Sequence, residues 1–151
     1  MKYDLKTTAL LYSTCFLTGT IILILEMLGF RIFAPYLGNS IYTSGSLIGI
    51  ILTALSIGYY VGGKIADLYP REELIFYFTF FSGLYLLGVF FSYKLILTYF
   101  QNFDLTVGAI LSTTVIFGVP MTLLSMTSPY LIKVMTSLDK IGESSGKIFS
   151  I

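Results

Sequence analysis

The chain has 151 residues, of which 56% are hydrophobic and only 11% are charged, and its mean hydropathy is +0.87, which excludes an ordinary soluble domain. Nine basic and eight acidic side chains nearly balance, so no strong field points to nucleic acid as a partner. There is no histidine and a single cysteine, Cys15, which excludes histidine triads, ordinary zinc sites and intrachain disulfides.

Four apolar stretches are each long enough to cross about 30 Å of hydrocarbon. None shows the alternating polarity of a membrane barrel strand, so we predict an all-α, polytopic transmembrane helical protein that forms a single domain over 1–151. A fifth span begins near Lys147, and the chain stops at Ile151, which predicts truncation at the C-terminus. The predicted spans are 8–28, 44–63, 74–93 and 105–127.

The first stretch also resembles a secretory signal peptide, because Lys2 and Lys6 precede an apolar core. That core exceeds the roughly 15 residues of a signal peptide, and no small-x-small cleavage site follows, so we interpret it as a retained span. Cys15, inside this run, is interpreted as an apolar packing residue.

The basic residues predict the orientation of the chain, because they stay on the cytoplasmic side of a membrane. Only Arg31 and Lys94 fall on the opposite side from the others. We therefore expect a cytoplasmic N-terminus and an integral protein of the cell membrane. The basic residues on the predicted cytoplasmic side are Lys2, Lys6, Lys64, Arg71, Lys133, Lys140 and Lys147.

Glu26 is the only acidic residue inside a predicted span, near its outer end, and an ionisable group in lipid is costly. Arg31 follows five residues later, about 140° further around an ideal helix, so the two face each other only if the helix ends or bends between them, for instance at Gly29. Two interpretations stay open: an ion pair or two groups that reach for water, and a ligand or proton site.

The second span ends with "GYYVGGKI", residues 58–65, which differs from a phosphate-binding loop at Ile65. Such a loop must follow a strand and needs a hydroxyl at that position, so we do not expect nucleotide binding. Small residues recur instead at every fourth position, and this spacing predicts a groove that packs closely against another helix. One row is Ala54, Gly58, Gly62 and Ala66, and the second is Gly45, Gly49 and Thr53.

The third span is rich in aromatic residues, and we interpret them as lipid contacts and packing rather than as a cage for a cation. Pro120 and Pro129 interrupt the fourth segment, since each removes a helix hydrogen bond. One interpretation is a kinked helix that continues to Met135, which we favour. The other ends the span near Thr127 and starts a short helix along the cytoplasmic face.

The run that follows span two, "GGKIADLYPREEL", is similar to the cytoplasmic loop motif between the second and third helices of major facilitator transporters. Leu68 and Pro70 depart from that motif. Asp67 and Arg71 then allow two interpretations. One is a solvated loop with weak salt bridges. In the other, Asp67 is a conformational latch whose partner helix lies in a missing half of the protein.

A narrower resemblance covers nearly the whole chain. It resembles the membrane portion of the fused major-facilitator/spermidine-synthase proteins, in which transporter-like helices precede a cytosolic aminopropyltransferase-like domain. The segments that carry it are Glu26, Arg31, Gly38 and Ser40, "GYYVGGKIAD", "LLSMTSPYLIKVM" and "GESSGKIFSI".

This resemblance implies half of a major-facilitator-like bundle and a link to polyamine metabolism. The transferase chemistry would belong to a domain that residues 1–151 do not contain, so we expect no catalytic, cofactor or metal residues here. The expected partners are the bilayer, further transmembrane helices and that cytosolic domain. Two alternatives are a fragment of a major facilitator carrier and a structural membrane subunit.

Overall fold

The computed structural model describes residues 5–69, 71 and 73–136, and every regular element in that part is helical. Four segments are long and apolar enough to cross a membrane, which confirms the predicted all-α, polytopic fold. The first three are single helices and the fourth is broken. The elements are α1 (Leu5–Leu37), α2 (Ile41–Leu68), α3 (Glu73–Phe100), α4 (Leu105–Thr113), the π-helix η1 (Thr114–Gly118), α5 (Val119–Ser125) and α6 (Thr127–Thr136).

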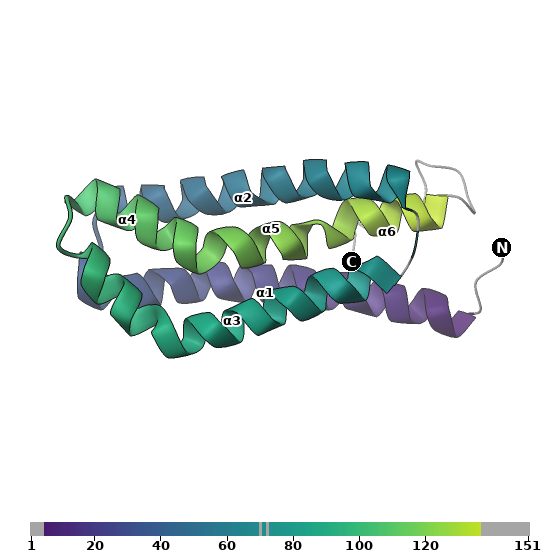
Figure 1. Ribbon diagram of the computed structural model, residues 1–151, viewed down its shortest axis with the longest axis horizontal. Helices are drawn as coiled ribbons and strands as arrows, with labels where there is room; N and C mark the ends of the chain where they lie inside the picture. Colours follow the sequence, from purple (N-terminus) through teal and green to yellow (C-terminus); the bar gives the residue numbers. More distant parts are fainter. Residues whose placement is uncertain (1–4, 70, 72, 137–151) are drawn as a thin grey trace.

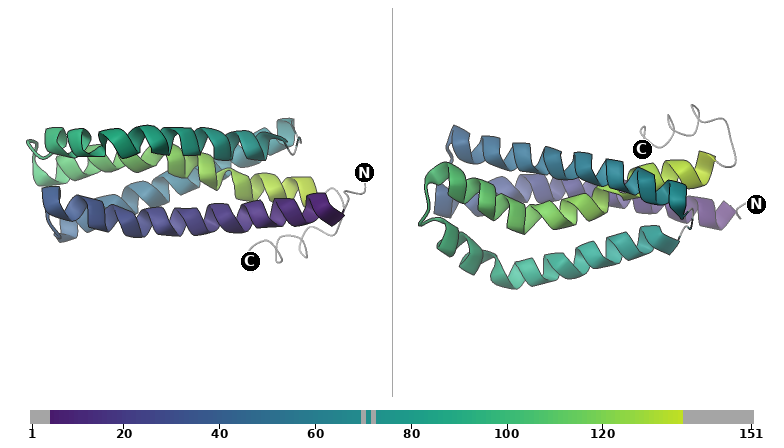
Figure 2. Two further views of the ribbon diagram at one scale, coloured as in Figure 1. Left: turned by 90° about the horizontal axis from the view of Figure 1, so that it is seen from below. Right: turned by 45° about the horizontal axis from the view of Figure 1, so that its top comes forward.

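The four spans run side by side along the long axis of the molecule (Figures 1 and 2). α2 packs along the whole broken fourth span, α3 packs mainly against α5, and α1 contacts α2, α5 and α6. The turn that joins α2 to α3 lies at the same end as α6 and the start of α1 (Figure 1). Lys64, Arg71 and Lys133 therefore share this end, as the charge count predicted; which side of a membrane it faces stays a prediction.

The helices extend past the predicted spans, because polar and aromatic residues at their ends continue the helix while hydropathy falls. The turn at 38–40 shows what stops them. Gly38 takes a φ of +69°, which glycine adopts without strain, and the Ser40 hydroxyl accepts a hydrogen bond from the Thr43 N–H at 3.1 Å. At the turn between α3 and α4, the Asp104 carboxylate caps α4 by accepting a hydrogen bond from the Thr106 N–H.

The core has two parts. The larger cluster fills the half of the bundle near the turns at 38–40 and 101–104, where Phe33 of α1 meets Phe117 of η1 edge to face at 6.0 Å. The smaller cluster fills the opposite end and consists of Leu11, Ala66, Ile75, Tyr130 and Leu131. Between them, α2 approaches the fourth span closely enough for backbone to meet backbone.

That approach takes place at Gly58 and Gly62. A Cβ atom on Gly58 would lie 2.4 Å from the Thr122 carbonyl oxygen, and one on Gly62 would lie 2.7 Å from the Cα atom of Met126. Both distances are shorter than any ordinary contact, so only glycine fits. This row of small residues, with Ala54 and Ala66 also buried, faces a span of the same chain.

The second row lies on a different face. Gly45 and Gly49 are exposed, and a Cβ atom on either would have no atom of the described residues within 4 Å. Thr53, one turn further, is exposed as well. Contact of this row with another helix stays a prediction.

We expect Gly58→Ala and Gly62→Ala to destabilise the protein by about 1–3 kcal/mol, because the added methyl group would push α2 away from α5 and α6. Gly49→Ala is the matched control on the same helix: it has open space, and alanine is the better helix former. Thermal unfolding of the three variants in one detergent measures the difference. Equal melting temperatures for Gly58→Ala and Gly49→Ala would contradict the close approach.

Candidate functional site

Glu26 lies well inside α1 rather than near an end of that helix. α1 continues to Leu37, eleven residues further, which places Glu26 about 16 Å from the end of the helix. The sequence placed Glu26 near the outer end of a span that stopped at 28. The helix continues past that point, and the depth of Glu26 in a membrane stays a prediction. The Glu26 side chain is half-buried.

Glu26 and Arg31 do not form an ion pair. The helix does not end at Gly29, so the two side chains keep their separation of about 140° around α1, and Arg31 is exposed. Among the described residues, the salt bridge that meets a 4.0 Å limit joins Lys133 and Asp67. Glu26 is therefore a carboxyl group in a membrane-spanning helix without a basic partner in the described part of the chain.

Asp67 finds a partner on α6. Its Oδ1 atom lies 2.7 Å from the Lys133 Nζ atom, and both side chains are more than half exposed. Water and salt screen such a pair, so it contributes less than about 1 kcal/mol. The sequence placed the partner of Asp67 in a missing half of the protein; the structure places one in the same chain, because α6 ends beside the end of α2.

The backbone of Arg71, rather than its guanidinium group, makes the stronger contact. Its N–H donates to the Tyr130 hydroxyl at 2.6 Å, and that hydroxyl donates to the carbonyl oxygen of Tyr69. Tyr130 is fully buried, and its ring meets Phe78 edge to face. One side chain of α6 thus fixes the α2–α3 turn on both sides of residue 70.

Sequence reasoning missed Tyr130. The available signal was a tyrosine in an apolar run, since a buried tyrosine hydroxyl usually needs a partner. The run "SPYLIK" did not say which partner, because Tyr69 and Arg71 are about sixty residues away in the sequence.

We expect Tyr130→Phe to destabilise the protein by about 1–3 kcal/mol, because it removes both hydrogen bonds of a buried hydroxyl. The Arg71 N–H and the Tyr69 carbonyl then keep only the 2.8 Å hydrogen bond that joins them to each other. Tyr59→Phe is the control, since Tyr59 is exposed on α2. Lys133→Ala should cost less than Tyr130→Phe, because the salt bridge is exposed. Thermal unfolding in detergent ranks the three variants. A larger loss for Lys133→Ala would contradict this assignment.

The fourth span contains a π-helix just before Pro120. The sequence left two interpretations: a kinked helix that continues to Met135, and a span that ends near Thr127 and is followed by a short helix. The structure combines features of both, because the span continues but is interrupted at Met126 and resumes as α6. α6 does not lie along the membrane face, because Tyr130 and Leu131 are fully buried against the bundle. Pro129 falls within α6, and Pro120 within the first turn of α5.

Hydroxyl groups of α3 satisfy the backbone around Pro120. Proline has no N–H, so the carbonyl five residues earlier, that of Val115, lacks its π-helical donor. The Tyr85 hydroxyl donates to this carbonyl at 2.6 Å, and the Ser82 hydroxyl donates to the Pro120 carbonyl at 3.2 Å. In lipid an unpaired carbonyl costs several kcal/mol, so these bonds allow the break to exist inside the bilayer.

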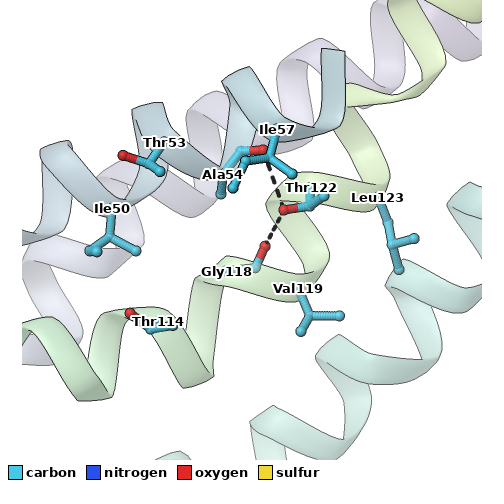
Figure 3. A pocket seen from close by; sticks show the side chains of 9 residues that line it. All are labelled: Ile50, Thr53, Ala54, Ile57, Thr114, Gly118, Val119, Thr122 and Leu123. Atoms are coloured by element: carbon cyan, nitrogen blue, oxygen red, sulfur yellow. Dashed lines mark hydrogen bonds between the residues drawn. The ribbon is translucent and has the colours of Figure 1, made fainter. Parts of the chain in front are cut away.

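A cavity of about 380 Å³ lies beside the π-helix, between α2 and the fourth span (Figure 3). The Thr122 hydroxyl donates to the Gly118 carbonyl at 2.8 Å, with a longer approach of 3.3 Å to the Ala54 carbonyl. The residues that line the cavity include no ionisable group, so it offers no acid–base chemistry. They are Ile50, Thr53, Ala54, Ile57, Thr114, Gly118, Val119, Thr122 and Leu123.

A second cavity, of about 480 Å³, continues the first and shares Ile50 and Thr53 with it. Gly45 and Gly49 line it, so the exposed row of small residues forms the floor of an extended groove on the outside of the four-span bundle. The exposed aromatic side chains of α3 lie apart from this groove: neighbours in sequence, such as Phe80 and Phe81 or Phe90 and Phe91, pair edge to face. The described rings therefore fit lipid contact better than a cage.

No protein-family model, curated protein or solved structure matches this chain. Glu26 is a half-buried acid inside the long apolar helix α1, and Asp67 and Tyr130 belong to the α2–α6 contact. In the described residues, no three histidine, cysteine or acidic side chains cluster in a way that could hold a metal ion.

We expect Tyr85→Phe to destabilise the protein by about 1–3 kcal/mol, because the Val115 carbonyl loses its donor in a low-dielectric region. Tyr77→Phe on the same helix is the control, because Tyr77 is exposed and its hydroxyl makes no hydrogen bond within the described part. Unfolding in detergent gives the loss, and hydrogen exchange at 114–120 localises it. An unchanged exchange rate there would contradict the role of Tyr85.

Proposed function

We propose that the chain is the transporter-like membrane module of a spermidine-synthase-like protein, which it anchors in the cell membrane with its N-terminus in the cytoplasm and which it serves by handling polyamines. The structural basis is a helical bundle with four membrane-span-like segments. The specific family and the polyamine link come from the sequence resemblance alone.

A contact between two distant segments of the chain supports the proposal beyond what composition does. Two of the segments on which the resemblance depends, "GYYVGGKIAD" and "LLSMTSPYLIKVM", lie about sixty residues apart and form one contact surface. Gly58 and Gly62 fit against Ser125 and Met126, and Asp67 pairs with Lys133. Residues that resemble one family thus serve one structural purpose together, as expected if the family resemblance reflects a shared fold.

Glu26 is the residue best suited to a polyamine or a proton. Polyamines are cations, and a carboxyl group without a basic partner in the described chain offers them a charge partner or a proton acceptor. Its position well inside α1 supports a role within the membrane rather than at the interface.

The deciding experiment uses the full-length protein in liposomes, with spermidine binding and uptake measured beside aminopropyltransferase activity. We expect a spermidine-dependent signal that Glu26→Gln lowers about tenfold or more, which corresponds to at least about 1.4 kcal/mol. Asp104→Asn is the control substitution, because Asp104 is an acid at the N-terminal end of α4 and does not belong to α1.

The outcomes separate the roles. Transferase activity without spermidine binding would reduce the module to an anchor. Absence of both would overturn the link to polyamines. Unchanged binding in Glu26→Gln would remove Glu26 from the site and leave the rest of the proposal standing.

A second candidate function is part of a larger helical carrier for another solute. The exposed groove over Gly45, Gly49 and Thr53 favours it, because small residues in lipid commonly mark a contact with another helix. Uptake of a solute other than a polyamine by the full-length protein would favour this candidate over the first.

A further inference from the structure

Two prolines interrupt the fourth span, and the structure satisfies the backbone around them differently. At Pro120, the carbonyl of Val115 receives a hydrogen bond from the Tyr85 hydroxyl. Pro129 also has no N–H, so the carbonyl of Ser125, four residues earlier, lacks its regular helical donor. Within the described residues, no side chain donates to this carbonyl.

An unpartnered hydroxyl lies two residues away. Thr127 is fully buried, and its Oγ1 atom has no hydrogen-bond partner in the described part of the chain. Other threonines in these helices donate to a carbonyl one turn earlier; Thr113 and Thr114 do so in the same span. Thr127 begins α6 directly after the interruption at Met126, and unlike those threonines it donates to no carbonyl of the described residues.

The neighbouring helices offer few protein groups that could hydrogen-bond to the Thr127 hydroxyl or the Ser125 carbonyl. On the α2 side, Gly62 packs directly on the Met126 backbone and carries no side chain. On the α1 side, the partly buried Cys15 lies next to Ser128. The Ser125 hydroxyl is occupied as well, because it donates to the Thr122 carbonyl at 2.9 Å.

We infer that an internal water molecule binds at this break and bridges the Thr127 hydroxyl to the Ser125 carbonyl. Water is the ligand that the chemistry favours, because it can both donate and accept, and buried waters typically join two to four polar groups that protein atoms leave unpaired. The site holds no charge that would favour an ion. Water inserted into the hydrogen-bond ladder is also a recognised cause of a break in a helix.

The test compares Thr127→Val, which keeps the shape and removes the hydroxyl, with Thr127→Ser, which keeps the hydroxyl. Thr114→Val in the same span is the control, since Thr114 is exposed and its hydroxyl bonds only within its own helix. We expect Thr127→Val to lower the melting temperature by about 2–4 °C or more, and Thr127→Ser and Thr114→Val to change it less.

The opposite result overturns the inference. If the site is dry, Thr127→Val removes an unsatisfied polar group, so the melting temperature should stay the same or rise. An experimental density map that shows ordered waters elsewhere in the protein provides the second measurement. Density between Thr127 and Ser125 in the wild type, and its loss in Thr127→Val, is expected; no density in the wild type overturns the inference whatever the melting temperatures are.

Discussion

The structure depends on one constraint: a backbone polar group inside lipid must find its partner within the protein. Three spans meet it as continuous helices, of which α1 contains one proline, Pro35, near its end. The fourth contains two prolines, and each one removes a donor. Side chains of α3 replace the hydrogen bonding around Pro120, through Tyr85 and Ser82. A broken span is therefore stable only as part of this bundle, which makes α3 a structural requirement and not merely a lipid-facing helix.

The same constraint explains the position of the glycines. Where the fourth span breaks, its backbone is irregular and must be shielded from lipid. α2 shields it at Gly58 and Gly62, which allow helix axes to approach until backbone meets backbone. Larger residues there would hold α2 away and expose the interruption at Met126. The glycine row and the prolines, though far apart in sequence, thus act together: the prolines break the fourth span, and the glycines let α2 cover the break.

Much of the fold could be predicted from the sequence, because hydropathy reports long apolar helices directly and four-residue spacing reports a packing face. The helices are longer than the predicted spans, since hydropathy falls at the interface while the helix continues, so the span bounds did not show how far Glu26 lies from the end of α1. The role of Tyr130 could not be predicted, because its partners are backbone groups of Tyr69 and Arg71, and sequence patterns do not report contacts between distant backbone atoms. For the same reason the two small-residue rows on α2 looked equivalent, although one is buried and the other lines an open groove.

The end of the bundle with the α2–α3 turn is held together by two interactions of different strength. At the end with the α2–α3 turn, Tyr130 and the Asp67–Lys133 pair hold α6 to α2, but the buried tyrosine contributes far more than the exposed ion pair. Release of the salt bridge alone would therefore leave α6 in place. Any motion of the fourth span that uses Asp67 must also break the bonds of Tyr130, so a latch formed by Asp67 alone is too weak to control this end of the bundle.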